Sequence, residues 1–245
     1  MTKNIIWLMG IALFSCHNVK STTNSEDTFT TTSGKQVKIE CYRHASLAIV
    51  YDGHIIQIDP VTDKEHGIVF DNKEKADAIL ITHDHYDHFD KTAIAQLSTD
   101  KTEIILNSDS QKELGKGIAL KNGETHVLNC KIKIEAVPAY NTTPEHLKFH
   151  PKGRDNGYIL NIENLRIYIA GDTEVITDMK NIKNIDIAFM PCNQPYTMTP
   201  KQLIEAARII HPKILFPYHF SETNLNEIPE KMKESGIETR IRNME

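Results

Sequence analysis

The sequence predicts an α/β fold in which two β-sheets pack together and helices cover their outer sides. Short apolar runs typical of strands occur in both halves of the chain, and helical patterns lie between the later runs of each half. Strand clusters with helices inserted between them are typical of layered α/β architectures. The composition does not change again after Gln36, so we expect one large domain over residues 36–245.

The first half begins with strands and continues with alternating strands and helices. Three runs near its start have strand character: 37–41, 46–51 and 54–59. Asp52-Gly53 provides a hairpin turn between the last two of them. The apolar run 76–81 predicts a buried strand, and it is followed by a predicted helix at 91–97, a strand at 103–106 and a helix at 108–114.

The second half also begins with strands and then continues with a helix and a further strand. Four apolar runs predict strands: 126–138, 157–162, 165–170 and 185–190, the last of which is apolar enough for the centre of a sheet. Residues 200–210 have an amphipathic helical pattern, with Thr199 as the N-cap and Pro200 at the first helical position. A final strand is predicted at 213–217.

Composition places the chain among ordinary globular proteins. It has 245 residues, of which 40% are hydrophobic and 25% charged, and its net charge is −5. This acidic balance does not favour a nucleic-acid-binding surface, so we expect no nucleic-acid partner. Cys41, Cys130 and Cys192 lie far apart without C-x-x-C spacing, which excludes a zinc ribbon. We expect buried thiols, with one disulfide as the alternative.

The N-terminus has the features of an export signal. Lys3 supplies a positive charge, and residues 5–14 form an apolar segment too short for a stable membrane span. The segment ends at Leu13-Phe14-Ser15-Cys16, which resembles a bacterial lipobox. We therefore expect a lipoprotein signal peptide at 1–16, a flexible tether at 17–35 and a lipid-anchored location in the bacterial cell envelope, facing the periplasm or the surface. Plain secretion, a retained anchor, or a tail without a tethering role are the alternatives.

A cluster of histidines and aspartates follows the predicted strand at 76–81. It consists of His83, His85, Asp87 and His88. Because residues two apart in an extended segment point the same way, His83 and His85 can bind one metal ion. Asp87 and His88 come after a turn and can serve a neighbouring ion. The alternative, a solvated histidine-rich loop, does not explain why ligand spacing coincides with a preceding buried strand.

Two more predicted strands end in possible metal ligands. The strand at 165–170 leads into Gly171-Asp172-Thr173, where the glycine permits a sharp turn before Asp172. The strand at 213–217 leads into Tyr218-His219. Either residue alone would be a weak signal. Three strand ends that each carry His or Asp favour a shared metal centre.

These motifs, in this order, resemble those of the metallo-β-lactamase-fold hydrolase superfamily over residues 38–242. The resemblance implies a four-layer αβ/βα sandwich with metal ions at one edge, between the sheets. It implies that His83, His85 and a middle histidine hold one ion, that Asp87, His88 and His219 hold the other, and that Asp172 bridges them. Both His146 and His150 are candidates for the middle ligand. We favour His150 because His150-Pro151-Lys152-Gly153 before Gly157-Tyr158 looks like a subgroup motif.

Other segments resemble a narrower subgroup, the ascorbate-6-phosphate lactonase-like proteins. They are Arg43-His44-Ala45-Ser46, Ile58-Asp59-Pro60 and the stretch 191–199. Asp59 either orients a ligating imidazole or serves as a turn carboxylate. His44 either lines the mouth of the site or is a structural histidine. Tyr140, Asn141 and Tyr196 either shape the pocket or serve in packing.

The expected activity is metal-dependent hydrolysis of a small-molecule ester, lactone or phosphodiester. Two divalent ions would convert a bridging water to hydroxide, and Asp87 would orient it and accept its proton. Zinc is the expected metal, with Mn²⁺ or Fe²⁺ as alternatives for mixed His and Asp ligands. The bridging Asp172 resembles phosphodiesterase, lactonase and thioesterase relatives rather than the commonest β-lactamases, which have Cys there. The alternative function is a metal-binding scaffold lipoprotein without turnover.

Overall fold

Two seven-stranded sheets form the centre of the computed structural model, which describes residues 26–244. The first sheet contains β1 (Glu26–Thr30), β2 (Gln36–Arg43), β3 (Ser46–Tyr51), β4 (His54–Ile58), β5 (Ala78–Leu80), β6 (Glu103–Leu106) and β7 (Ile118–Ala119), in that spatial order. The second contains β8 (Thr125–Val127), β9 (Lys133–Ala139), β10 (Asp155–Ile162), β11 (Leu165–Ile169), β12 (Ile187–Pro191), β13 (Ile214–Tyr218) and β14 (Glu238–Thr239), also in order.

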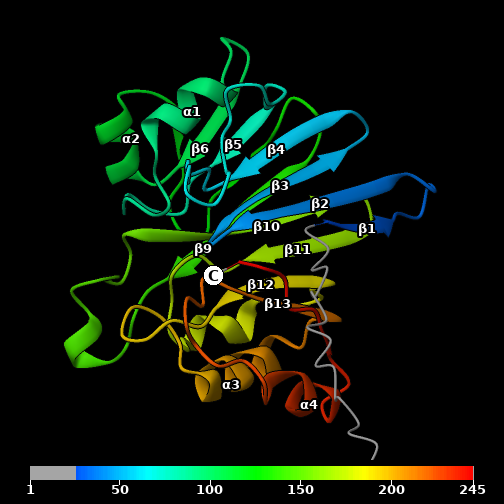
Figure 1. Cartoon of the computed structure of the whole chain (residues 1–245), viewed down its shortest axis with the longest axis vertical. Coiled ribbons are helices and arrows are strands. Elements are labelled where there is room, and N and C mark those ends of the chain that lie inside the picture. The colour runs from blue at the N-terminus through cyan, green and yellow to red at the C-terminus, as the bar shows by residue number, and fades with distance from the viewer. Residues whose placement is uncertain (1–25, 245) are drawn as a thin grey trace, which may run out of the picture.

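Helices cover the outer faces of both sheets, as Figure 1 shows. Helices α1 (Lys91–Leu97) and α2 (Ser108–Leu114) lie on the first sheet. Helices α3 (Pro200–Ile210) and α4 (Ile228–Lys233) lie on the second, and short 3-10 helices occur at Pro144–His146 and Thr177–Asn181. The predicted four-layer αβ/βα sandwich is therefore confirmed. Among residues 26–244, no helix has the length and apolar character needed to cross a bilayer.

The two halves share one topology. In each sheet the first four strands pair antiparallel, and the remaining strands pair parallel. Parallel strands need a crossover, which explains why the helices follow the later strands of each half. The similarity of the halves therefore lies in the order and direction of their strands.

Strand β5 shows why its sequence is continuously apolar. Ala78 and Leu80 belong to the main core between the two sheets. Ile79 belongs to a second apolar cluster that also contains Ile94 and Leu97 of α1. Alternate side chains thus enter different cores, and the strand is buried on both faces.

Most predicted elements are confirmed, including α1, β6, α2 and α3 at their predicted bounds. Thr199 caps α3 through a capping box with Gln202. The single strand predicted at 126–138 is wrong. The chain turns between β8 and β9, where Lys131 has φ 69° and the Lys131 N–H donates to the Leu128 carbonyl at 2.8 Å. The short elements β7, β14 and α4 were not predicted.

Part of the predicted tether belongs to the sheet. Residues 17–35 were assigned to it, but β1 (Glu26–Thr30) pairs with β2 along its whole length. Its Thr-rich composition concealed an edge strand with only Asp27 and Phe29 turned inward. The sheet therefore starts at Glu26 rather than at Gln36. The predicted signal peptide and the first part of the tether lie outside the described residues.

The described cysteines are free thiols. Cys41 and Cys192 are buried, and burial raises the pKa of each thiol to about 12. Cys130 is half-buried, and burial raises its pKa as well. All three are therefore protonated at neutral pH and behave as small apolar residues.

Asp27 joins β1 to the end of the chain. Its buried carboxylate accepts hydrogen bonds from Arg240 at 2.8 Å and from two nitrogens of Arg242 at 2.8 and 2.7 Å. Removing the carboxylate would leave half-buried Arg242 without an acidic partner among the described residues and half-buried Arg240 with only the exposed Glu238. We expect Asp27→Ala to lower the free energy of unfolding by about 2 kcal/mol, measured by urea denaturation.

The matched control for this measurement is Glu113→Ala in α2, where alanine suits the helical backbone. Glu113 pairs with Lys91 at 3.0 Å, but both side chains are about half exposed. Solvent screens such a pair, so the control should keep the wild-type unfolding midpoint. An Asp27→Ala protein with that same midpoint would contradict the role assigned to Asp27.

Candidate metal centre

The histidine-rich motif forms a short loop between β5 and α1. The Ile81 N–H still donates to the Ile105 carbonyl of the neighbouring strand, after which the chain leaves the sheet. The amides of His88 and Phe89 then both donate to the carbonyl of His85, at 3.0 and 2.9 Å. This turn reverses the chain after the first two histidines. As a result, His83 and His88 are buried, whereas His85 and Asp87 are half-buried and face solvent.

Asp172 and His219 approach the same edge from the second sheet. They follow β11 and β13, which run in the same direction as β12 between them, so their carboxyl ends meet at one edge. Gly171 makes the turn before Asp172 with φ 65°, and a Cβ there would lie 2.7 Å from the Asn156 carbonyl oxygen. Only glycine fits this turn. His219 has φ 47°, an unusual conformation for a histidine.

Four imidazoles surround the Asp172 carboxylate. The Nε2 atoms of His150 and His219 lie 3.3 and 3.2 Å from its Oδ2. His83 Nε2 lies 3.9 Å from the same oxygen, and His88 Nε2 lies 3.4 Å from Oδ1. Asp172 is 2% exposed and stands between rings contributed by three separate loops.

These atoms have no other hydrogen-bond partners in the described part of the chain. The Nε2 atoms of all four histidines and Oδ1 of Asp172 are buried and unsatisfied. Buried polar atoms without a partner are costly, so a native site that gathers five of them is built for something they bind. Imidazole nitrogens and carboxylate oxygens are the donor set that zinc and similar ions prefer. The residues therefore fit a metal centre.

The opposite nitrogen of three rings is anchored. His88 Nδ1 lies 2.8 Å from Asp59 Oδ2, and His150 Nδ1 lies 3.0 Å from Asp155 Oδ2. Because the hydroxyl of Thr82 donates to Asp59 at 2.6 Å, its oxygen accepts from His83 Nδ1 at 2.9 Å. A proton held on Nδ1 leaves the Nε2 lone pair directed at the centre, as in most metal-bound histidines.

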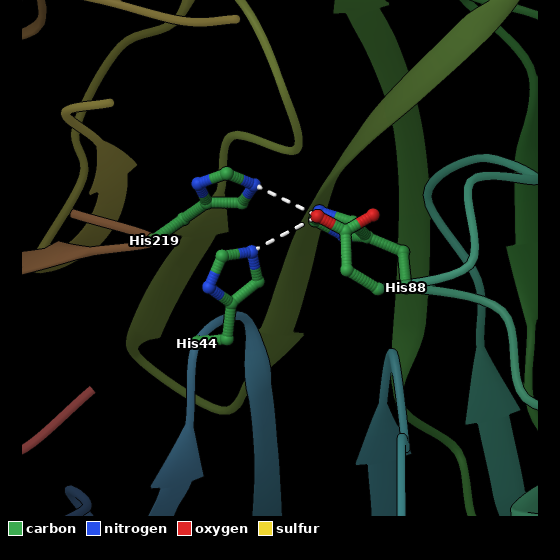
Figure 2. A group of neighbouring side chains, drawn as sticks. His44, His88 and His219 are labelled. Carbon is green, nitrogen blue, oxygen red and sulfur yellow. Dashed lines mark hydrogen bonds and ion pairs between the residues drawn. The ribbon is translucent and has the colours of Figure 1, made fainter. Parts of the chain in front are cut away.

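The predicted residues are brought together in two groups. Nitrogens of His83, His85 and His150 lie within 4.8 Å of one another, as do ligand atoms of His44, Asp87, His88 and His219. Asp172 lies between the groups, with His83 and His88. This division follows the two halves that the resemblance implies. Figure 2 shows His44 and His219 directed at one carboxylate beside His88. The two Nε2 atoms lie 3.1 and 3.6 Å from Asp87 Oδ2.

Other predicted residues lie beside the cluster rather than in it. His146 is outside both groups, and its Nδ1 bonds the buried Glu174 at 2.8 Å, so of the two candidates only His150 reaches the centre. Asp59 orients His88 as described. Tyr140 donates to Asp178 and Asn141 donates to the Tyr196 carbonyl, which gives both a packing role. Sequence reasoning missed Asp155 and Thr82, because nothing in their spacing marks them as partners of histidines.

The cluster shifts the pKa values of its members in opposite directions. Burial favours neutral groups, but nearby opposite charges outweigh it at several positions. The Asp155 and Asp172 carboxylates raise the pKa of His150 to about 9, and the Asp172 charge raises that of His219 to about 10. Burial alone would raise the pKa of Asp87, but the His219 and His44 rings hold it far below the usual range. Burial dominates at His83 and lowers its pKa strongly.

A cavity of about 560 Å³ opens over the centre. His85, Asp87, His150, Asp172 and His219 form its base, and Tyr86, Phe149 and Tyr196 line its walls. A second cavity of about 910 Å³ adjoins it across His44, Tyr86, Asp87 and Ser221. Both cavities have volumes within the range of known small-molecule binding sites.

Known proteins are similar to this chain over most of its length. Residues 38–219 match the β-lactamase superfamily domain. A UPF0173 metal-dependent hydrolase from Ligilactobacillus salivarius (strain UCC118) is 34% identical over 214 residues, covering 80% of this chain and 95% of the relative. Another, from Flavobacterium johnsoniae, is 33% identical over 206 residues, which cover 78% of this chain and 88% of that relative.

The comparison with solved structures finds the same fold. The crystal structure of a candidate metal-dependent hydrolase from Parabacteroides distasonis ATCC 8503 is 54% identical, with a TM-score of 0.86, and covers 90% of this chain and 99% of its own. The superfamily predicted from the motifs is confirmed, since both the domain match and the relatives span most of the chain. The chain belongs to the UPF0173 family of metal-dependent hydrolases, within the β-lactamase superfamily.

Proposed function

We propose that the protein is a dinuclear metal-dependent hydrolase of a small ester, lactone or phosphodiester. The observation that carries the proposal is the group of four buried Nε2 atoms around the buried Asp172, where neither these nitrogens nor Asp172 Oδ1 has a hydrogen-bond partner. One ion would be held by His83, His85 and His150. The other would be held by Asp87, His88 and His219, with Asp172 shared between them. Zinc suits this donor set best, and Mn²⁺ or Fe²⁺ also suit it.

The chain's own groups complete the chemistry. When bound, the ions would supply acidification of water and polarisation of the scissile bond. Asp87 lines the cavity, so we assign it the orientation of the attacking water and the acceptance of its proton. The buried partners Asp59, Thr82 and Asp155 hold the imidazoles in place.

The shape of the site favours turnover over a scaffold role. A metal-binding scaffold needs closed coordination, as structural zinc sites have, whereas a catalytic site keeps an open position. Here His85 and Asp87 are half-buried at the base of an open cavity that would admit a small substrate. The mixture of tyrosine and phenylalanine with polar groups in its walls suits an organic ester or lactone.

Replacing the shared carboxylate tests the dinuclear form. We expect wild-type protein to bind about two divalent ions per chain and to hydrolyse at least one member of a panel of phosphodiesters, lactones and thioesters. Asp172→Ala should lose the ions and fall at least about 100-fold in activity, because four imidazoles lose their common partner. Metal analysis and initial rates measure this.

The control for that comparison is Asp109→Ala, because Asp109 is a half-exposed carboxylate of α2 whose ion pair among residues 26–244 is with Lys112. It should keep both metal content and rate. Full activity of Asp172→Ala with a single ion would refute the dinuclear centre. Two bound ions in wild-type protein with no activity on any substrate would favour the scaffold.

Metal binding should release protons. In the metal-free protein His150 and His219 have raised pKa values, about 9 and about 10, so both carry protons at pH 7.5. Ligation requires the neutral rings, so loading should release about two protons per chain and weaken as the pH falls. Titration calorimetry in two buffers of different ionisation enthalpy measures the number. Proton uptake, or no change, would contradict this electrostatic account.

We also propose that the protein is anchored in the bacterial cell envelope through a lipid on Cys16. The proposal is supported by the positive Lys3, the apolar segment 5–14 and the lipobox-like sequence Leu13-Phe14-Ser15-Cys16. We expect Cys16→Ser to abolish incorporation of labelled palmitate and to move the protein from the membrane fraction to the soluble one. Labelling that persists in the variant would rule the anchor out.

A further inference from the structure

We propose that His44 is a positioning residue that holds Asp87 and His219 in place for the second metal ion; this rests on the proposed function and deepens it. His44 occupies the two-residue turn between β2 and β3 of the first sheet. His219 follows β13 of the second sheet, and Asp87 lies on the loop after β5. Figure 2 shows the His44 ring beside His219 and directed at the same carboxylate.

Three contacts connect His44 to this half of the centre. Its Nε2 lies 3.1 Å from Asp87 Oδ2, within hydrogen-bonding distance. Its backbone carbonyl accepts the N–H of His219 at 3.0 Å. The two imidazole rings lie 3.7 Å apart between centroids. One residue therefore fixes both the backbone of one proposed ligand and the side chain of another.

The surroundings of His44 differ from those of three of the five proposed histidine ligands. Ligand-like rings here have Nδ1 anchored and Nε2 buried without a partner, as in His83, His88 and His150. In His44 the pattern is reversed, since Nε2 bonds Asp87, and the hydrogen bonds among residues 26–244 include none to its Nδ1. Its side chain is 22% exposed, against 0–2% for the buried ligand-like rings. These differences favour a donor to Asp87 over a further metal ligand.

The backbone of the turn supports the same role. His44 has φ 56° and His219 has φ 47°, so both residues adopt the left-handed conformation that favours glycine. Such conformations persist in histidine only where surrounding structure enforces them, and they concentrate at functional sites. Pairing of Arg43 with Ser46 fixes the turn, which directs both the carbonyl and the ring of His44 toward His219.

The test is a stepwise Zn²⁺ titration of the folded, full-length protein against a competing chelator. We expect His44→Ala to weaken the second ion about 10- to 100-fold and to leave the first unchanged. His44→Gln, which keeps an N–H donor of similar reach, should recover part of the loss. His211→Ala is the matched control, because His211 has φ 55° but is exposed at the end of α3, and it should bind both ions like wild type.

A second measurement determines which ring nitrogen of His44 carries the proton. Long-range ¹H–¹⁵N NMR of the imidazoles should place the proton of His44 on Nε2, in both metal-free and zinc-loaded protein. Unchanged second-ion affinity in His44→Ala, a proton on Nδ1, or a zinc-shifted Nε2 resonance would each overturn the proposal. Failure of wild-type protein to bind two ions would instead refute the dinuclear centre, and the metal-free spectrum would still decide the role of His44.

Discussion

The burial of the Asp172 carboxylate among four imidazoles is the constraint on which the rest of the site depends. An ionised carboxylate that is 2% exposed is stable only with compensating charges or hydrogen bonds. The charges of His219 and His88 provide them and hold the pKa of Asp172 well below its ordinary value. Because the rings come from loops of both sheets, this one group requires the two halves of the sandwich to meet in a fixed register.

A second layer of buried polar residues makes that arrangement rigid. Asp59 bonds both the Thr82 hydroxyl and His88, and Thr82 in turn accepts from His83. A single carboxylate on the first sheet thus sets two rings from opposite ends of the histidine-rich loop. Asp155, itself held by Arg154 at 2.7 Å, does the same for His150. His83, His88 and His150 are thus each oriented by a partner that does not line the cavity.

Sequence reasoning succeeded where local pattern and chemistry coincide. The loop 83–88 was recognisable because metal-competent residues follow a strand buried on both faces, and α3 was recognisable from its cap and amphipathic pattern. It failed where long-range contacts decide the outcome. Nothing near β1 shows that Asp27 will meet Arg240 and Arg242. Likewise, spacing alone left both His146 and His150 open, since Glu174 captures His146 from a segment that is distant in the sequence.

The ion pairs of Asp27 with Arg240 and Arg242 have a consequence for the order of folding. Its partners are separated by more than 200 positions, so the N-terminal edge of the sandwich stays incomplete until synthesis of the chain is nearly finished.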